Sequence, residues 1–452
     1  MDLRNKTLSA SGFHSPQRGI IDVLDDVLIE IDADGVITAV HRHGDPNYRT
    51  IRDTRDASGE LVRLPARTYV LPGFVDLHVH APQYPQLGDA LDVALEVWLQ
   101  KYTFPLEARY QDAAFARHIY RLLVDDLVAN GTTTALYFAT IHQEATRALV
   151  DICLEKGQRA LIGKVAMDNA DECPEYYRDR SGKEALEGTR ALIDYVRGHP
   201  QNGEGRVLPV VTPRFIPSCT DATLEGLGAI ARECACHVQT HCSESDWAQG
   251  YVLARHGMTD ADSLDRFGLL SRKTVLAHGN FLSAKDMETV RARGAAVAHC
   301  PLSNAYFANA VFPLRAALEK GLHVGLGTDI SGGPSASMLE NARGAILASR
   351  MLQRGVDPNL PAAARATFGP AQIDFRDAFY IATTGGGIAL DLPVGQFTPG
   401  YQFDAVLIDA DAEKGTVRLF EDRDKGERIL QKIIYTASRP NIAATWVGGR
   451  KV

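Results

Sequence analysis

The residues of this chain best suited to chemistry are four histidines and one aspartate, each in a short apolar run. They are His78 and His80 in FVDLHVH (74–80), His241 in HVQTHCSE (237–244), His278 in TVLAHG (274–279) and Asp329 in HVGLGTD (323–329). Side chains along a strand alternate between its two faces, so His78 and His80 share one face and can bind one ion. Three imidazoles and one carboxylate suit a Zn²⁺ or Fe²⁺ site that keeps a position open for water.

These residues can meet only if the runs that carry them are strands of one sheet. Eight β-rich runs alternate with helical stretches: FVDLHVH (74–80), TTTALYFA (132–139), RALIGKVAM (159–167), VLPVVTPRF (207–215), HVQTHCSE (237–244), TVLAHG (274–279), GAAVAHC (294–300) and HVGLGTD (323–329). This alternation predicts a parallel sheet with helical crossovers, and eight units predict a (β/α)8 barrel. Because barrel active sites lie at the carboxyl ends of the strands, we expect the histidines and Asp329 to converge there.

One covering helix can be tested against its own periodicity. Residues 111–130 place apolar side chains at helical spacing, and these are Phe115, Ile119, Leu122, Leu123 and Leu127. The spacing predicts a helix whose apolar face packs on the outside of the barrel. Gly131 is expected to cap its carboxyl end.

Both ends of the chain predict strands of a smaller domain. Residues 23–40 alternate apolar and polar side chains around Asp34-Gly35, a strong hairpin signal, and GYQFDAVLIDA (400–410) and NIAATWVGGRKV (441–452) close the chain. The expected fold is therefore α/β, with a TIM-like (β/α)8 catalytic barrel over residues 72–395. A small β-sandwich domain would combine residues 1–71 with residues 396–452.

Composition limits the partners and the location. Among 452 residues, 48 Lys+Arg face 56 Asp+Glu, which gives a net charge of -8, and no basic stripe suggests a nucleic-acid partner. No apolar run approaches the ~20 residues of a membrane helix, and the first residues lack the apolar core of a signal peptide. The seven cysteines fit reduced thiols better than a disulfide framework, so we expect a cytoplasmic protein.

The cysteines are not expected to extend the metal site. Cys234 and Cys236 form a C-x-C, but no second pair lies at zinc-finger spacing, so both are interpreted as buried small hydrophobes. The signature H-x-E followed by P-C-x-x-C is also absent. Its absence excludes the fold that carries many zinc nucleobase deaminases, but it does not exclude that chemistry.

Taken together, the motifs resemble the amidohydrolase superfamily, and within it the barrel-type guanine deaminases. The resemblance extends from about residue 20 to the end, through PGFVDLHVH (72–80), HVHAPQY (78–84), VWLQKYTFPLE (97–107), NGTTTALYFATIH (130–142), TPRF (212–215), HCSE (241–244), AHCPLSN (298–304) and GLGTDISGG (325–333). The metal motifs are common to the superfamily, whereas YTFP and the combination of Gln83 with Arg214-Phe215 are more specific. The chain departs from the pattern of these enzymes at Pro82, at Leu302 and at residues 305–307, and these differences could alter the rim of the pocket.

The resemblance implies a hydrolytic deaminase that converts guanine to xanthine and ammonia. One Zn²⁺ per chain, with Fe²⁺ less favoured, would be held by His78, His80, His241 and Asp329. His278 would orient the attacking hydroxide, and Asp329 would receive the proton of the water. Glu244 would protonate ring N3; the alternative for Glu244 is a solvated charge or a charge at a helix N-terminus. The resemblance also implies a homodimer.

Recognition of a purine needs a planar polar slot, and the resemblance assigns it to Gln83, Arg214 and Phe215, with His241 and Glu244 also touching the substrate. Arg214 offers fixed donors for a carbonyl O6, and Gln83 offers both a donor and an acceptor. Phe215 can stack on the base or simply pack in the core. The alternative for Arg214 is a salt bridge at the surface.

Several alternatives remain open at this level. Lys164 could suggest a modified lysine bridging two metals, but no comparable lysine ends the next strand, so one metal is expected. His237, at the start of its strand, is interpreted as structural, and His299 could line the pocket. Rival functions are a related aminohydrolase acting on 8-oxoguanine, another purine or a triazine, and a barrel retained only as a binding scaffold.

Overall fold

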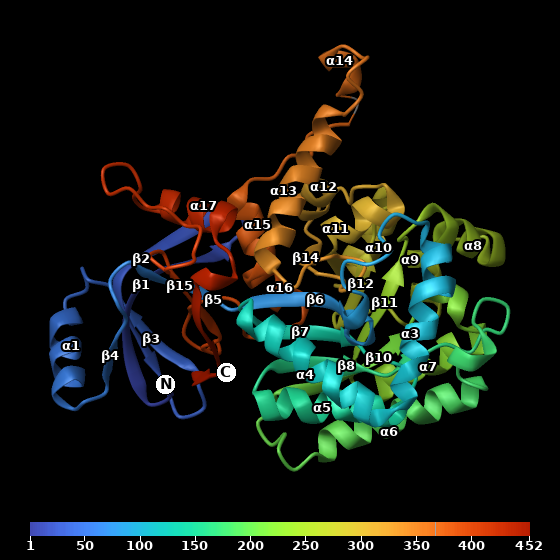
Figure 1. The fold of residues 1–452 in the computed structure, drawn as a ribbon, viewed down its shortest axis with the longest axis horizontal. Coiled ribbons are helices and arrows are strands. Elements are labelled where there is room, and N and C mark those ends of the chain that lie inside the picture. The colour runs from blue at the N-terminus through green and yellow to red at the C-terminus, as the bar shows by residue number, and fades with distance from the viewer. Residues whose placement is uncertain (367) are drawn as a thin grey trace.

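A barrel of parallel strands is the larger of two bodies in the computed structural model, which describes residues 1–366 and 368–452 (Figure 1). The barrel strands are hydrogen-bonded in the order β14-β13-β12-β11-β10-β8-β7-β6. Their bounds are β6 (Phe74–His80), β7 (Thr132–Phe138), β8 (Arg159–Gly163), β10 (Val207–Pro213), β11 (His237–Cys242), β12 (Thr274–His278), β13 (Ala296–His299) and β14 (His323–Leu326). The short β9 (Val165–Ala166) pairs with β10. All eight predicted strands are thereby confirmed.

Asp76 joins the first and last strands and so closes the barrel. Its carboxylate accepts hydrogen bonds from the backbone N–H of Thr328, at 2.9 Å, and from the Thr328 hydroxyl. Beyond it, the N–H of Asp329 donates to the carbonyl of His78, at 2.8 Å. The same closure therefore places the end of β14 beside the two histidines of β6.

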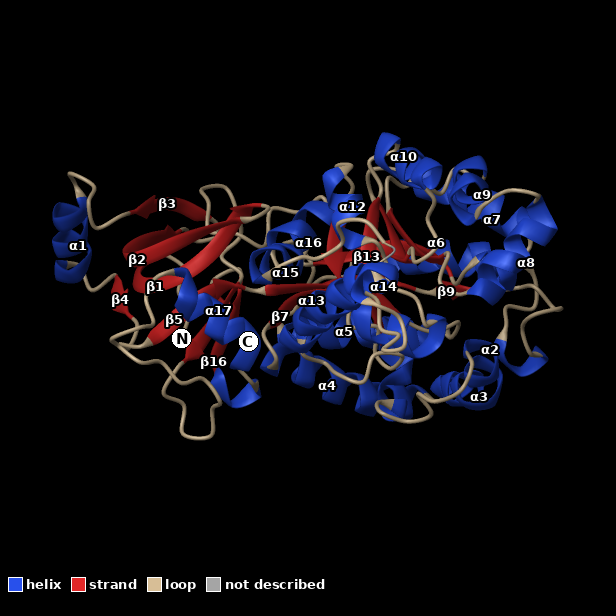
Figure 2. Ribbon diagram, turned by 90° about the horizontal axis from the view of Figure 1, so that it is seen from above, coloured by secondary structure: helices blue, strands red, loops and turns tan. Residues whose placement is uncertain are grey.

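Helices cover the outside of the barrel (Figure 2). They are α4 (Ala113–Ala129), α5 (Gln143–Lys156), α6 (Gly182–Gly198), α7 (Asp221–Glu233), α8 (Asp246–His256), α9 (Asp260–Arg266), α10 (Ala284–Ala292), α12 (Leu314–Glu319), α13 (Met338–Arg354), α15 (Phe375–Ala382) and α16 (Thr384–Ala389). The shorter α2 (Leu95–Trp98), α3 (Phe104–Ala108) and α11 (Pro301–Ser303) lie in loops that follow carboxyl ends of strands.

The predicted helix is α4, and its buried face differs from the expected one. Ile119, Leu123 and Leu127 are buried as expected, but Leu122 is 45% exposed. The buried face also runs through Tyr120 and Val124, so its centre is rotated away from Leu122. Gly131 adopts the expected left-handed backbone just beyond the helix, with φ +83°.

The smaller domain combines both ends of the chain, as predicted, and both termini lie in it (Figure 1). Its strands form one continuous sheet in the order β17-β16-β15-β5-β1-β2-β3, with β4 beside β1. They are β1 (Lys6–Gln17), β2 (Ile20–Ile31), β3 (Ile37–His41), β4 (Leu61–Arg63), β5 (Thr68–Pro72), β15 (Ala405–Asp409), β16 (Ile442–Val447) and β17 (Arg450–Lys451). Asp34-Gly35 lies in the turn between β2 and β3. Two helices, α1 (Tyr48–Ala57) and α17 (Glu427–Thr436), belong to these terminal segments.

An arm extends from the barrel, made by the outer part of α13 and by α14 (Ala362–Arg365) at its tip (Figure 1). Several apolar side chains along it are exposed, namely Leu347, Met351, Val356 and Leu360. Across residues 1–366 and 368–452, we find no helix with the length and apolar character needed to cross a membrane.

Candidate active site

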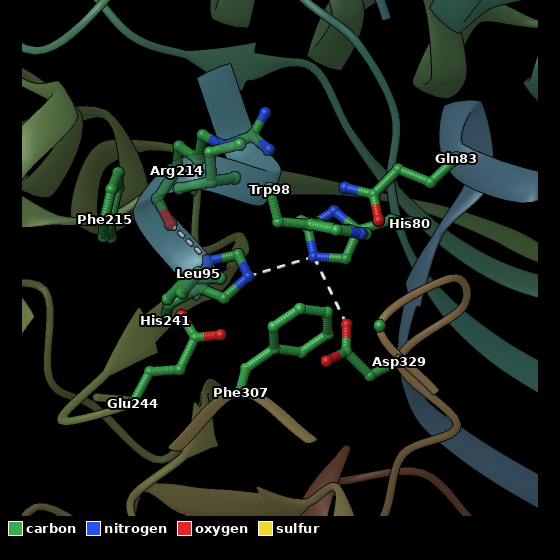
Figure 3. Close-up of a pocket in the computed structure, with 12 residues that line it drawn as sticks. His80, Gln83, Leu95, Trp98, Arg214, Phe215, His241, Glu244, Phe307 and Asp329 are labelled. Atoms are coloured by element: carbon green, nitrogen blue, oxygen red, sulfur yellow. Dashed lines mark hydrogen bonds and ion pairs between the residues drawn. The ribbon is translucent and has the colours of Figure 1, made fainter. Parts of the chain in front are cut away.

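The carboxyl ends of β6, β11 and β14 bring the four proposed metal ligands together. His80 Nε2 lies 3.0 Å from His241 Nε2 and 3.5 Å from Asp329 Oδ1 (Figure 3). His78 Nε2 lies 3.2 Å from the same oxygen. His78 Nε2 is buried and forms no hydrogen bond within the described part of the chain. Three overlapping groups have ligand atoms close enough to hold an ion: His78 with His80 and Asp329, His78 with His241 and His278, and His278 with Cys300 and Asp329.

The protonation of these histidines favours metal binding. Burial lowers the pKa of His78, His80 and His241 well below the usual value, so all three rings are neutral near pH 7. His241 Nδ1 lies 2.6 Å from the carbonyl oxygen of Arg214 and donates to it. That hydrogen bond fixes the tautomer and leaves the Nε2 lone pair free for a metal. The donor set of imidazoles and one carboxylate therefore fits Zn²⁺ or a similar divalent ion.

Glu244 is aimed into the site by a sharp turn after β11. Ser243 has a left-handed backbone, with φ +47°, and its hydroxyl donates to Asp260 at 3.2 Å. Asn280 Nδ2 donates to the carbonyl of Glu244 at 2.9 Å. Burial, with a smaller contribution from the charge of Asp329, raises the pKa of Glu244 to about 8. A carboxyl group that is protonated near neutral pH can act as a general acid.

His278 faces both carboxylates from the end of β12. Its Nε2 lies 3.5 Å from Glu244 Oε1 and 3.8 Å from Asp329 Oδ2. Its Nδ1 lies 2.9 Å from Asn304 Oδ1, an acceptor, so Nδ1 carries a proton. The contact with Asn304 therefore holds the His278 ring with Nε2 directed at the carboxylates of Glu244 and Asp329. Nothing in the sequence assigned a role to Asn304.

Gln83, Arg214 and Phe215 line the same pocket as Glu244 and three of the proposed metal ligands, His80, His241 and Asp329. Arg214 is 3% exposed and Gln83 1% exposed, so neither is a surface residue. In Figure 3 these two side chains lie on one side of His80 and His241, while Glu244 and Asp329 lie on the other. Phe215 is buried, with its ring centroid 6.2 Å from that of His241. The pocket thus has a side that can recognise a base and a side that can carry protons.

Glu107 links Gln83 and Arg214; it ends the motif VWLQKYTFPLE (97–107), but no role was assigned to it from the sequence. The Glu107 carboxylate accepts from Arg214 Nη1 at 2.7 Å and from Arg214 Nη2 at 3.1 Å. Its Oε1 also accepts from Gln83 Nε2 at 2.8 Å. Glu107 stands on α3 between apolar residues, where spacing alone does not distinguish a buried acid from an exposed one.

Apolar side chains form the remaining walls of the pocket. They are Leu95, Trp98, Leu99 and Phe307. The rings of Trp98 and Phe307 lie 4.9 Å apart between centroids, and Phe307 belongs to a π-helical turn, Asn304–Ala308. The aromatic rings among these walls offer flat apolar surfaces to a planar ligand. The sequence marked 305–307 only as a variable rim.

Other residues considered in the sequence lie outside this cluster. His237 Nε2 lies 2.8 Å from the carbonyl of Leu390 at the opposite end of the barrel, in agreement with a structural role. Lys164 pairs with Asp179 at 2.6 Å, so it does not reach the metal ligands. His299 is buried against Phe312, with 5.5 Å between ring centroids.

Comparisons with known proteins confirm the resemblance seen in the sequence. A family model described as "Amidohydrolase family" matches residues 69–452. A guanine deaminase of Homo sapiens is 37% identical over 400 residues, which cover 87% of this chain and 85% of that protein. A guanine deaminase of Dictyostelium discoideum is 33% identical over 464 residues, which cover 99% of this chain and 98% of that protein.

A solved structure extends the comparison to the fold. The crystal structure of guanine deaminase from C. acetobutylicum, with bound guanine in the active site, superimposes with a TM-score of 0.86 and 29% sequence identity. The superposition covers 99% of both chains. With its family model, its relatives and this shared fold in agreement, the chain belongs to the amidohydrolase family, in the group of the guanine deaminases.

Proposed function

We propose that this chain is a guanine deaminase, which hydrolyses guanine to xanthine and ammonia. The observation that carries the proposal is one pocket in which an ion-binding cluster, a protonated Glu244 and the pair Arg214 and Gln83 meet. The relatives that match over most of the chain are guanine deaminases, so the alternative of an aminohydrolase for 8-oxoguanine or a triazine is not favoured.

The residues that would hold the metal are His78, His80, His241 and Asp329, with one Zn²⁺ per chain. The neutral His78 Nε2 supports this, because a buried imidazole nitrogen that makes no hydrogen bond is costly unless a ligand uses it. When bound, such an ion supplies Lewis acidity that makes water nucleophilic near neutral pH.

Each proton in the reaction has a carrier among the buried side chains. Asp329 takes a proton from the attacking water, and Glu244, protonated in this setting, gives one to ring N3. His278, held by Asn304, keeps the water directed at C2. Oxygen is added at C2, the C2–N bond breaks, and the amine leaves as ammonia after receiving a proton through Asp329. The hydroxyl proton left on C2 then passes to the deprotonated Glu244 as the carbonyl of xanthine forms, which restores the acid. Water and guanine thus account for every atom of xanthine and ammonia.

The base would be read on the opposite side of the pocket. Arg214 donates to the carbonyl O6, Gln83 contacts a polar ring edge, and Phe215 packs against the ring. Adenine carries a donor at C6 and no amine at C2, so in the same pose it would meet the Arg214 donors without an acceptor and would offer nothing to displace.

The experiment that tests the proposal is turnover by the purified, zinc-loaded protein. Guanine should yield equal amounts of ammonia and xanthine, and adenine should yield very little ammonia. A substrate panel with 8-oxoguanine and a triazine, followed by ammonia release, tests the alternatives. A fully metallated protein that leaves guanine unchanged would reject the proposal and restore the scaffold hypothesis.

We also propose that the protein is a homodimer. The exposed apolar side chains on the arm of α13 and α14 support this, because a second copy would remove them from water. Sedimentation of the parent should give twice the chain mass, and Met351→Glu should shift the protein toward the monomer. A parent that sediments as a monomer at micromolar concentration would contradict it.

A cytoplasmic location is the corresponding proposal for the cell. All seven cysteines are free, and six of them are buried, which suits a reducing compartment. Fractionation of cells producing the protein, followed by guanine deaminase activity in each fraction, would test it.

A further inference from the structure

We propose that Glu107 is a positioning residue for base recognition, and that one carboxylate fixes both Arg214 and Gln83 in the geometry that reads guanine. This inference rests on the proposed function, because it concerns the same pocket. It adds a residue that does not line the pocket and acts only through two side chains that do.

Glu107 and Arg214 form a bidentate ion pair. Both Arg214 terminal nitrogens donate to the two oxygens of Glu107, at 2.7 and 3.1 Å. A bidentate pair of this kind fixes the plane of the guanidinium as well as its position. Phe104 lies over the guanidinium, 5.0 Å from Arg214 Cζ to the ring centroid, and limits its movement from another side. The donors that remain on Arg214 therefore point in set directions.

The same Glu107 carboxylate also orients Gln83. Oε1 of Glu107 accepts from Gln83 Nε2 at 2.8 Å, while Gln83 Oε1 accepts from the backbone N–H of Ser331 at 3.2 Å. With an acceptor at one end and a donor at the other, the amide cannot flip without losing both contacts. Arg214 comes from β10 and Gln83 follows β6, so Glu107 sets the distance between recognition groups on different strands.

All three of these side chains are buried. Glu107 is 0% exposed, Gln83 1% and Arg214 3%. Water cannot replace a lost partner at such depth, so removal of the Glu107 charge leaves the Arg214 cation buried without compensation. The Arg214 cation would then turn toward other acceptors, and the carboxylates on the far side of the pocket are candidates.

A matched pair at the opposite end of the barrel separates positioning from general stability. Arg159 forms a bidentate pair with Asp404, with Nε to Oδ2 at 3.0 Å and Nη2 to Oδ1 at 3.2 Å. The Asp404 side chain is 0% exposed, as Glu107 is. This pair lies outside the pocket, so Asp404→Asn reports the cost of breaking a buried arginine–carboxylate pair without touching recognition.

The test is steady-state kinetics on zinc-loaded enzyme, with metal content and thermal midpoint measured for each variant. Glu107→Gln should lower kcat/KM for guanine on the order of 10- to 100-fold, mainly through KM, with metal content unchanged. Asp404→Asn should lower the thermal midpoint and leave kcat/KM within about threefold of the parent. Glu107→Asp, which keeps the charge but shortens the side chain, should lose roughly 10-fold and covers the case in which Glu107→Gln does not fold.

A double-mutant cycle with Arg214→Met decides whether Glu107 acts through Arg214. If it does, Glu107→Gln in the Arg214→Met background should cost no more than about threefold further. Losses that multiply in the double variant, or a Glu107→Gln or Glu107→Asp enzyme within about threefold of the parent, would overturn the inference. Failure of the parent to turn over guanine would instead reject the proposed function, so the two failures are distinguishable.

Discussion

Two histidines on one strand show how differently the two ends of this barrel are built. His237 opens β11 and His241 lies near its other end, and both are buried. The His237 ring is satisfied by the backbone carbonyl of Leu390. The His241 ring places Nε2 against Nε2 of His80, at 3.0 Å, and its Nδ1 donates to the carbonyl of Arg214, so Nε2 carries the lone pair that a metal could use. The same residue type therefore stabilises the fold at the amino end and serves chemistry at the carboxyl end.

Buried carboxyl groups also differ between the amino and carboxyl ends of the barrel. At the amino end, Asp404 is neutralised by the bidentate Arg159. At the carboxyl end, burial raises the pKa of Glu244 to about 8 and that of Asp260 to about 7. Left-handed backbone does not separate the two ends, because Ser243, His278 and Asp329 adopt it at the carboxyl end and Ala235 and Asp391 adopt it at the amino end. The contrast lies in the carboxyl groups, since raised pKa values gather where a site is assembled.

The largest expected effect comes from replacing one of the two histidines of β11 and not the other. His241→Asn should lose the metal and lower kcat/KM on the order of 10³-fold or more, because metal assistance supplies several kcal/mol of transition-state stabilisation. His237→Asn, four residues away, should keep metal and activity and lose only thermal stability. Metal analysis and guanine kinetics on both variants check this; equal activity losses would show that the two ends are not functionally distinct.

Glu244→Gln comes next, with an expected fall in kcat of roughly 10²–10⁴-fold while zinc stays bound. In the proposed mechanism the acid form of Glu244 is the active one, and its raised pKa keeps it protonated up to about pH 8. Activity of the parent should therefore fall as the pH rises through about 8. The glutamine variant should lack this alkaline decline, and a decline of the same shape in both enzymes would assign it to another group.

Asn304→Ala should have a smaller effect, on the order of 10-fold in kcat, because it frees the His278 ring without removing it. Asn304→Asp keeps an acceptor at the same place and should recover most of the loss. Metal content should be unchanged in both variants. An alanine variant as active as the parent would show that β12 alone orients His278.

Much of the fold, and the convergence of the four histidines with Asp329, could be predicted because each depends on local, periodic signals. Alternation of strands with helices gave the barrel, and the position of a histidine along its strand gave the end at which it lies. Glu107, Asn304, Trp98 and Phe307 could not be found in this way, because they stand in irregular loops and short helical turns. Their roles come from contacts between segments far apart in the chain, such as Glu107 with Arg214, and no periodicity encodes these.

The error on α4 has a related cause. Spacing placed Leu122 on the apolar stripe, but the helix lies on the barrel along a line through Tyr120 and Val124. Apolar side chains at the edge of a stripe, such as Leu122, are buried or exposed according to the rotation of the helix on the sheet. That rotation is set by tertiary packing and not by the helix sequence alone.

The smallest expected effect concerns Asp260, which supports the turn that aims Glu244. Burial, aided by the charges of Asp286 and Glu244 and opposed by hydrogen bonds from Ser243, raises its pKa from 3.8 to about 7. Between about pH 4 and pH 7 the folded protein therefore binds one more proton here than the unfolded chain does. The free energy of unfolding must fall as the pH rises through that window, by at most about 1.4 kcal/mol per pH unit from this group.

Asp260→Asn removes this dependence, because the amide resembles the protonated carboxyl and does not titrate. Relative to the parent, the variant should gain about 1–3 kcal/mol of stability between pH 5 and pH 8, measured by urea unfolding at each pH. The catalytic rate near pH 6 should change little, since Asp260 is protonated there in the parent and the Ser243 hydroxyl still finds an acceptor.

At the amino end, Asp404→Asn should not gain stability as the pH rises, because it removes the partner of a permanently charged arginine. A pH-independent difference between parent and Asp260→Asn would mean that Asp260 is already ionised in the folded state. The carboxyl end would then tolerate a buried charge without a cation, and the contrast between the two ends would rest on the histidines alone.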